Sequence, residues 1–393
     1  MKKLLFMINS FECGGAEKSL VSLLNELDFN QYQVFIQVIN RGGMFENLLP
    51  DGVTILPELE YERFCKKTIV QQIFSNNLKF LKARVWTAWE LRKNARYGKP
   101  LHDTQAYWKR SEQAFDMLKE EYDVAIAWGQ GTPTHFIANK VRAKKKIAWI
   151  NADYEAVGHN AEFDLEIYGQ YQIIVCVSNE LSLKMQKAFP VYAEKIRTIY
   201  DINNEDLIVR MSKEVVNDIN TRGVVIVTVG RLVKQKGYDI AINAASSLKK
   251  KNIDFTWYII GEGPERRELE KRIREYHLEN NFVLLGAKKN PYPYMRMANV
   301  YVQTSKSEGF CITLAEARIL NRPCVTTAFD TAYDQIIQGK NGLIVAMNAE
   351  SVADGIWKML NDPKLYFRIQ KYQESEKKGN KEEIEKFYEL LKR

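Results

Sequence analysis

Short apolar runs alternate with stretches of helical periodicity along most of the chain. The runs typical of buried strands lie in the first half at 4–8, 34–39, 53–56, 124–127, 146–150 and 173–177. Helical spacing of apolar residues predicts helices there at 16–27, 134–141 and 180–189. The pattern pauses at the polar stretch 200–206, which we interpret as an inter-domain linker.

The alternation then restarts and continues almost to the end. Predicted strands lie at 224–229, 256–260, 282–285, 300–304, 323–327 and 343–346. Predicted helices lie at 238–250, 264–276, 313–320 and 351–361. Repeated alternation of this kind predicts an α/β protein with two parallel, doubly wound sheets, whose ligands bind beyond the carboxyl ends of the strands.

These patterns divide the chain into three parts. Residues 1–200 form one expected domain and residues 201–373 a second, while the charged tail 374–393 has a weak helical pattern. We expect two facing Rossmann-like domains with a cleft between them.

Composition agrees with two ordinary globular domains. The 393 residues are 46% hydrophobic and 27% charged, and no apolar run reaches the ~18 residues that a membrane span needs. Five scattered cysteines form no CxxC pair, which favours a reducing cytoplasm over a disulfide framework or a zinc site.

The net charge of +8 has a local origin. Residues 61–110 hold twelve Lys or Arg against three Asp or Glu, so this segment carries +9 and the rest of the chain −1. It also breaks the strand–helix alternation, and we interpret it as a basic insertion in the first domain.

Two glycine-rich motifs follow predicted strands. Gly14 and Gly15 precede the first helix, where they either make a tight turn or let the backbone approach an anion. The segment 230–237 reads GRLVKQKG, and its Arg231 and Lys236 suit a diphosphate, although solvated charge is the ordinary alternative. We expect Lys234 to be merely exposed.

Two further motifs follow later strands. The segment 261–264, GEGP, fits a helix start, and we favour a structural role for it. The segment 308–316 places Glu308 before a helix and Glu316 about two turns later. We expect the N–H groups of Gly309, Phe310, Cys311 and Ile312 to lie at the helix start, where they could bind phosphate. The alternative is a helix-dipole acid with a solvated Glu.

Together, GGAE at residue 14, GRLVKQKG at 230, GEGP at 261 and the Glu-x7-Glu spacing from Glu308 to Glu316 resemble the group-1 (family 4) retaining glycosyltransferases of GT-B fold. The order and spacing carry the resemblance, which covers nearly the whole chain. It implies that Arg231 and Lys236 hold the donor diphosphate and that Glu316 binds the ribose hydroxyls. It further implies that the tail 374–393 crosses back onto the first domain.

The resemblance assigns roles on the sugar side as well. Glu308 would contact the hydroxyls of the transferred sugar, and Gly15 would lie against the phosphates or the sugar. Family members often carry a histidine, closely followed by an acid, in the loop after the strand at 146–150; this chain has Asn151 and Asp153 there. Asn cannot act as a base but can hydrogen-bond a sugar hydroxyl. We expect nearby His159 to be exposed and not to replace the missing histidine.

The implied reaction is front-face substitution, in which the leaving diphosphate takes the acceptor's proton and protein cations stabilise its charge. The chain contains no Asp-x-Asp, so we expect a metal-independent hexosyl- or N-acetylhexosaminyltransferase without a cofactor. The nucleotide-sugar, by family resemblance a UDP-sugar, is a substrate. The alternative is a catalytically weak sugar-nucleotide-binding partner of an active transferase, which the Asn151 substitution motivates.

Within the basic insertion, an apolar stripe follows helical spacing, and it consists of Val70, Phe74, Leu78, Leu81, Val85 and Trp89. A basic amphipathic helix with aromatic residues indicates an anionic membrane surface, whereas the competing interpretation packs the stripe on the first domain. No nucleic-acid motif accompanies the charge, so we expect no nucleic-acid partner. We expect a cytoplasmic protein, peripheral on the inner face of the plasma membrane, that acts on a glycan or lipid-linked acceptor in bacterial surface polysaccharide synthesis.

Overall fold

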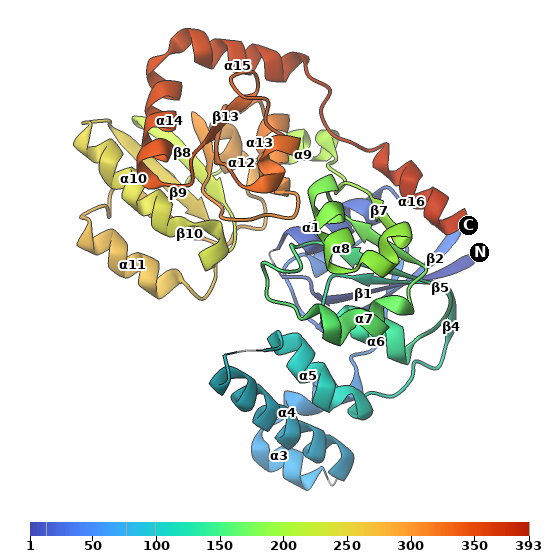
Figure 1. Cartoon of the computed structure of the whole chain (residues 1–393). Coiled ribbons are helices and arrows are strands. Elements are labelled where there is room, and N and C mark those ends of the chain that lie inside the picture. The colour runs from blue at the N-terminus through green and yellow to red at the C-terminus, as the bar shows by residue number, and fades with distance from the viewer. Residues whose placement is uncertain (13, 76, 99, 393) are drawn as a thin grey trace. The chain divides into compact units, whose positions relative to one another are not determined.

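The computed structural model describes all residues except 13, 76, 99 and 393, and it divides into two compact units (Figure 1). The first unit comprises residues 1–12, 16–200 and 383–393, and the second comprises 14–15 and 201–382. Each unit contains a fully parallel sheet with α-helices between most successive strands, so the fold class is α/β with two Rossmann-like domains.

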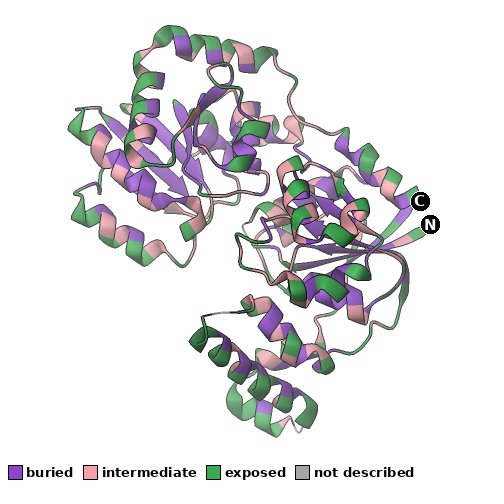
Figure 2. Cartoon of the chain, in the orientation of Figure 1, coloured by how far each residue is buried: buried purple, intermediate pink, exposed green. Residues whose placement is uncertain are grey.

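The first sheet has seven strands in the order β3-β2-β1-β4-β5-β6-β7. Its strands are β1 (Lys2–Ser10), β2 (Tyr32–Asn40), β3 (Val53–Ile55), β4 (Glu121–Trp128), β5 (Arg142–Ile150), β6 (Ile173–Cys176) and β7 (Ile196–Thr198). The helices between them are α1 (Gly15–Asn25), α6 (Thr132–Lys140), α7 (Ala161–Gly169) and α8 (Asn179–Ala188). The apolar runs of the sequence correspond to the central strands, which Figure 2 shows as buried.

The second sheet has six strands in the order β10-β9-β8-β11-β12-β13. Its strands are β8 (Val224–Val229), β9 (Phe255–Ile260), β10 (Phe282–Gly286), β11 (Val300–Gln303), β12 (Cys324–Thr327) and β13 (Gly342–Val345). Its helices are α9 (Glu205–Met211), α10 (Tyr238–Lys250), α11 (Arg266–Glu275), α12 (Tyr292–Met297), α13 (Ile312–Ile319), α14 (Ala349–Asn361) and α15 (Pro363–Ser375).

Both ends of the second unit differ from the sequence-based boundaries. Helix α9 begins inside the predicted linker because the Asn204 side chain accepts a hydrogen bond from the Leu207 N–H at 3.0 Å and caps it. The tail 374–393 is not one segment, since α15 continues to Ser375 and residues up to 382 belong to the second unit. Only the last helix, α16 (Glu383–Lys392), joins the first unit, where Phe387 stacks on Phe6 of β1 with ring centroids 6.1 Å apart.

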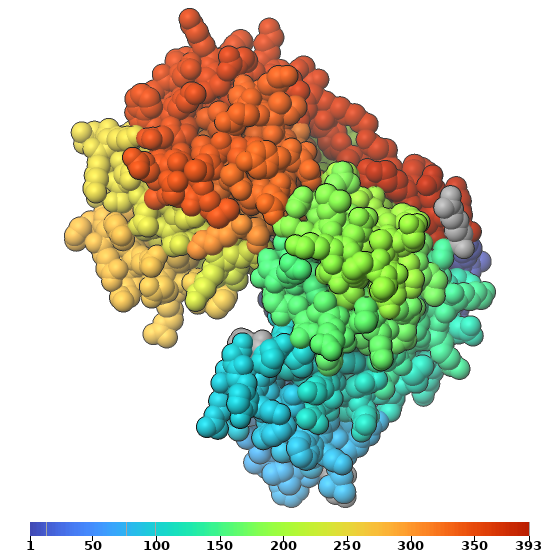
Figure 3. Space-filling view, in the orientation of Figure 1, coloured from blue at the N-terminus to red at the C-terminus, as the bar shows by residue number. Residues whose placement is uncertain are grey.

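The described residues of the basic insertion form one long and three short helices, which make up a lobe of the first unit (Figure 3). They are α2 (Glu60–Cys65), α3 (Ile69–Phe74), α4 (Leu78–Arg96) and α5 (Asp103–Ser111). The predicted stripe is therefore divided between two helices, because α3 ends at Phe74 and α4 begins at Leu78. The Asn77 side chain caps α4 by accepting a hydrogen bond from the Phe80 N–H at 3.1 Å.

The stripe does not pack on the domain, so the packing interpretation is wrong. Five of its side chains are 46–83% exposed, namely Val70, Phe74, Leu78, Val85 and Trp89. Helix α4 instead packs through its opposite face, where three of the buried side chains are the polar Thr87, Glu90 and Asn94. Glu90 is neutralised there by Lys109 at 3.0 Å and Arg110 at 2.8 Å.

Candidate active site

Three loops of the second unit meet at the carboxyl edge of its sheet. They are 230–237 after β8, 261–264 after β9 and 304–311 after β11. The Lys306 N–H donates to the Gln235 carbonyl at 2.7 Å, and the Leu232 N–H donates to the Glu262 carbonyl at 2.9 Å. The structure thus brings together three motifs, of which the first and the third are separated by more than sixty residues in the sequence.

Glycines allow these loops to approach one another. Gly237 has φ +64°, and a Cβ atom on it would lie 2.0 Å from the Thr304 carbonyl oxygen. Gly261 has φ +157°, and a Cβ there would lie 1.9 Å from the Gly230 carbonyl oxygen. A side chain at either position would overlap backbone atoms, which agrees with the structural role expected for 261–264.

Lys236 and Glu308 form an ion pair where the first and third loops meet. Their Nζ and Oε1 atoms are 2.6 Å apart, and the side chains are only 17% and 10% exposed. Burial lowers the pKa of Lys236, but the adjacent Glu308 carboxylate raises it more, so the net shift is upward. Lys236 therefore stays charged in a largely dry position, where a cation interacts strongly with an anion. Arg231 of the same loop is exposed.

The segment between Glu308 and α13 leads directly into the helix. Helix α13 begins at Ile312, one residue before the predicted start, and Cys311 is its N-cap, while Gly309 and Phe310 lie in the preceding loop. Cys311 has φ +65°, a left-handed conformation that an α-helix cannot include. Of the four N–H groups expected at the helix start, those of Cys311 and Ile312 lie there, and those of Gly309 and Phe310 lie in the loop before it.

Two residues missed by sequence reasoning hold this loop. The Gln335 side-chain amide donates to the Phe310 carbonyl and, at 3.3 Å, to the Cys311 carbonyl. The Thr331 hydroxyl donates to the Glu308 carbonyl at 3.2 Å. Side-chain contacts to a backbone more than twenty positions away leave no local pattern in the sequence.

Glu316 lies inside the second unit and is 1% exposed. The Tyr292 hydroxyl, another group that sequence reasoning missed, donates to its Oε1 at 2.9 Å. Burial and the neighbouring carboxylate raise the pKa of Tyr292, which therefore remains a hydrogen-bond donor. Tyr292 thus helps to position Glu316.

In the first unit, the loop after β5 carries Asn151 and Asp153. The side-chain amide of Asn151 is buried, and neither its oxygen nor its nitrogen has a hydrogen-bond partner. Buried polar groups without partners are rare, and one at a strand's carboxyl end suits a ligand. The remaining candidate, Gly15, is the first residue of α1. It belongs to the second unit, whereas the rest of α1 belongs to the first.

Asp153 is fully engaged in holding its own loop. Its Oδ1 accepts from the Glu155 and Ala156 N–H groups, each at 3.1 Å, and its Oδ2 lies 2.8 Å from the Lys184 ammonium. Burial raises the pKa of Asp153, but these hydrogen bonds lower it more. The geometry therefore supports a positioning role for Asp153 and not direct chemistry.

Comparison with known proteins identifies the type of protein. Residues 210–376, which contain all three loops, match the family described as glycosyl transferases group 1. The chain carries a group 1 glycosyltransferase domain. The N-acetylgalactosamine-N,N'-diacetylbacillosaminyl-diphospho-undecaprenol 4-alpha-N-acetylgalactosaminyltransferase of Campylobacter jejuni is 26% identical over 93% of this chain and 92% of its own. An uncharacterised glycosyltransferase of Methanocaldococcus jannaschii is 27% identical, over only 43% of each chain.

Solved structures show that this glycosyltransferase has the GT-B fold. S. aureus TarM, in a crystal structure with UDP, superimposes with a TM-score of 0.70 and 18% identity over the whole of both chains. Anabaena HepE, solved with UDP-glucose, gives a TM-score of 0.68 and 17% identity over 95% of this chain and 94% of its own. The predicted fold class is thereby confirmed.

The glycosyltransferase also contains a buried histidine cluster beside the Asn151 loop, contrary to the expectation that His159 is exposed. The His159 side chain is 4% exposed and stacks on His102 with ring centroids 4.3 Å apart. Asp164 lies beneath, 3.8 Å from the Nδ1 of His159 and 2.7 Å from the Nε2 of His135. The aromatic rings of the insertion and the loop cover His159, which no sequence periodicity could indicate.

We expect this cluster to make the folded first unit less stable at acidic pH. Burial, together with His102, lowers the pKa of His159 from 6.5 to about 4. Between these values the unfolded chain binds a proton that the folded chain does not, so stability falls as the pH drops from 6.5 to 4. A shift of this size corresponds to about 3 kcal/mol. We expect denaturant unfolding of the first unit to show this loss, and His159→Gln to flatten it.

The matched control is His277→Asn, because His277 is exposed in the second unit. We expect this variant to keep the pH dependence of the wild type. An identical slope in the His159 variant would contradict the assignment.

Proposed function

We propose that this glycosyltransferase moves a sugar from a UDP-sugar to a glycan or lipid-linked acceptor with retention of anomeric configuration, as a family 4 enzyme. The observation that carries the proposal is the Lys236–Glu308 ion pair at the carboxyl edge of a parallel sheet. The loops around this pair contain glycines at positions where a side chain would overlap neighbouring backbone atoms. The UDP named in the TarM and HepE structures supports the choice of base, and the undecaprenol-linked substrate in the Campylobacter enzyme's name supports the acceptor class.

In the proposed donor site, each residue contacts a particular part of the nucleotide-sugar. Lys236 and the exposed Arg231 carry the charge of the diphosphate, assisted by Gly15 and the N–H groups of 309–312. Glu308 binds hydroxyls of the transferred sugar and Glu316 those of the ribose. The unpartnered Asn151 amide hydrogen-bonds a sugar hydroxyl, while Asp153 positions the loop.

In the proposed reaction, the bond from the anomeric carbon to the diphosphate breaks, and the acceptor oxygen bonds to the same face of that carbon. The proton of the acceptor hydroxyl passes to the departing phosphate oxygen, so no protein base is required. Lys236 and Arg231 stabilise the charge that develops on the diphosphate, a role that makes metal-independent transfer feasible.

Thermal unfolding in the presence of UDP-, GDP- and ADP-glucose tests the donor assignment. A ligand at a hundred times its dissociation constant stabilises the folded state by about 2.7 kcal/mol. We expect the UDP-sugar alone to raise the unfolding temperature by several degrees, and equally in excess EDTA. No stabilisation by any of the three would contradict the proposed site, and a shift that EDTA abolishes would contradict metal independence.

We further propose that the insertion docks on an anionic membrane on the cytoplasmic side. All four apolar side chains of α3 are 60–83% exposed, and they are Ile69, Val70, Ile73 and Phe74. The outer face of α4 adds Leu78, Val85, Trp86 and Trp89 among basic residues. Such contiguous apolar surface marks an interaction site, and the local charge of +9 selects an anionic partner.

The two tryptophans are arranged as at a membrane interface. Trp86 and Trp89 meet edge to face with centroids 5.7 Å apart, and the Arg110 guanidinium lies 5.7 Å from both rings. An amphipathic ring beside a cation suits the boundary between acyl chains and anionic headgroups. No helix among the described residues is long and apolar enough to cross a membrane.

Vesicle flotation tests the docking surface. We expect the wild type to float with vesicles of phosphatidylcholine and phosphatidylglycerol but not with phosphatidylcholine alone. Changing both Trp86 and Trp89 to Ala should weaken binding by about tenfold or more, because both rings leave the interface. Trp357→Ala is the matched control, because Trp357 lies in the second unit, is 45% exposed and has the ammonium of Lys251 over its ring. Flotation independent of anionic lipid would contradict the proposal.

A further inference from the structure

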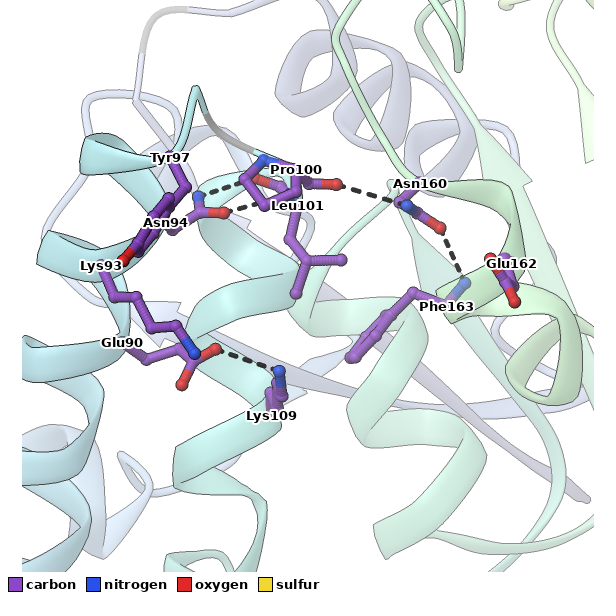
Figure 4. Close-up of a pocket in the computed structure, with 10 residues that line it drawn as sticks. All are labelled: Glu90, Lys93, Asn94, Tyr97, Pro100, Leu101, Lys109, Asn160, Glu162 and Phe163. Carbon is purple, nitrogen blue, oxygen red and sulfur yellow. Dashed lines mark hydrogen bonds and ion pairs between the residues drawn. The ribbon is translucent and has the colours of Figure 1, made fainter.

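A cavity of about 610 Å³ opens on the first unit, and none of the residues that line it is a predicted donor-binding or catalytic residue (Figure 4). Its walls come from the C-terminal half of α4, from Pro100 and Leu101 before α5, from α5 itself and from the start of α7. The insertion and the Rossmann-like core therefore build it jointly.

The cavity lies beside the carboxyl edge of the seven-stranded sheet. Thr104, at the start of α5, approaches the turn after β4 so closely that a Cβ on Gly131 would lie 2.6 Å from its Oγ1. Asn160 of the cavity wall ends the loop that follows β5. This is the edge where parallel sheets bind ligands.

Two asparagines hold the walls in place. Asn94 both donates to the Leu101 carbonyl at 2.7 Å and accepts from the Leu101 N–H at 3.0 Å. Asn160 accepts from the Phe163 N–H at 2.9 Å and donates to the Pro100 carbonyl at 3.3 Å. The cavity is thus preformed, and its amides are used for structure.

The remaining lining combines rings with balanced charge. Tyr97 and Phe163 supply aromatic surface. The charged lining residues are two glutamates and two lysines, which sum to zero, and Glu90 is already paired with Lys109 and Arg110. Such a site lacks the excess of cations that a phosphate requires. Rings together with isolated charged groups suit a neutral ligand that has apolar faces and many hydroxyls.

We infer that this cavity binds the neutral saccharide portion of the acceptor, an inference that rests on the proposed transferase function. The cavity and the proposed reaction centre share one loop, because Asn151 begins the segment that Asn160 ends, and the Tyr154 hydroxyl donates to the Asn160 carbonyl at 3.0 Å. The cavity also adjoins the docking face, since the ammonium of its Lys93 lies 5.2 Å from the Trp89 ring centre. A membrane-anchored acceptor would then present its glycan to the Asn151 loop through this cavity.

Saturation-transfer NMR on the full chain tests this inference with a panel of neutral hexose and N-acetylhexosamine di- and trisaccharides. We expect at least one to bind at millimolar concentration. Tyr97→Ala should weaken it about tenfold by removing a ring, and Leu101→Trp should abolish it by filling the cavity. Tyr97 is 70% exposed, so its loss should not affect folding.

Tyr333→Ala, at a tyrosine 64% exposed in the second unit, is the matched control and should bind like the wild type. No saccharide binding by the wild type, or binding unchanged in both cavity variants, would overturn the inference. Competition by inorganic phosphate would also overturn it, in favour of an anion site. Stabilisation by UDP-glucose in the same variants separates the two proposals, because none of the proposed donor-site residues lines the cavity.

Discussion

Replacing Lys236 by alanine is expected to lower the transfer rate at saturating donor by about 10²- to 10³-fold, the range typical for removal of one preorganised charge-stabilising group. The ammonium lies in a mostly buried position 2.6 Å from Glu308, and its charge is maintained there by the carboxylate. Without the ammonium, the Glu308 carboxylate has no counter-charge, and its repulsion of the departing diphosphate raises the barrier to transfer. The rate is measured as UDP release with the acceptor present.

Lys234→Ala provides the matched control, because Lys234 belongs to the same loop but is exposed. It should keep the wild-type rate. A melting temperature for each variant shows that the fold survives the loss of the ion pair. Wild-type transfer by the Lys236 variant with saturating donor would contradict the assignment of the diphosphate site.

The second large effect concerns stability. Gly237→Ala is expected to lower the free energy of unfolding of the second unit by about 3 kcal/mol or more. The left-handed backbone costs an alanine about 1 kcal/mol, and the new Cβ would lie 2.0 Å from the Thr304 carbonyl oxygen, so the two loops must separate. Guanidinium unfolding, followed by tryptophan fluorescence, measures the change.

Gly339→Ala separates the two contributions. Gly339 lies in the same unit with φ +71°, but the nearest atom to its added Cβ would be 4.0 Å away. It should cost only the backbone strain of about 1 kcal/mol. Equal losses in the two variants would show that the close approach of the loops after β8 and β11 does not matter.

The sheet order and the donor motifs show what a sequence can reveal. Buried parallel strands are continuous apolar runs, so the central strands and their alternation with helices were predictable. Lys236 and Glu308 were predictable as candidates because parallel strands end at one edge, which brings their loops together. Their direct ion pair was not, since no local pattern reports a contact between residues 72 positions apart.

The insertion shows where periodicity leaves two outcomes open. Helical spacing marks one face of α4 as apolar, and this face suits either packing on the domain or contact with a membrane. In the structure Val85 and Trp89 face outward while Glu90 and Asn94 are buried with partners. Pairing with distant residues decides which face is buried, and the sequence does not display that pairing. The same reason concealed the burial of His159.

Proton NMR of the products formed from α-linked UDP-sugars, in excess EDTA, tests the central claim most directly. Slow transfer to water suffices, so the acceptor need not be known. Front-face retention predicts that UDP and the α-anomer of the free sugar appear first and in equal amounts. First release of the β-anomer would contradict front-face retention. Cleavage of none of the UDP-, GDP- or ADP-sugars would contradict transferase chemistry and leave a protein that only binds sugar nucleotides.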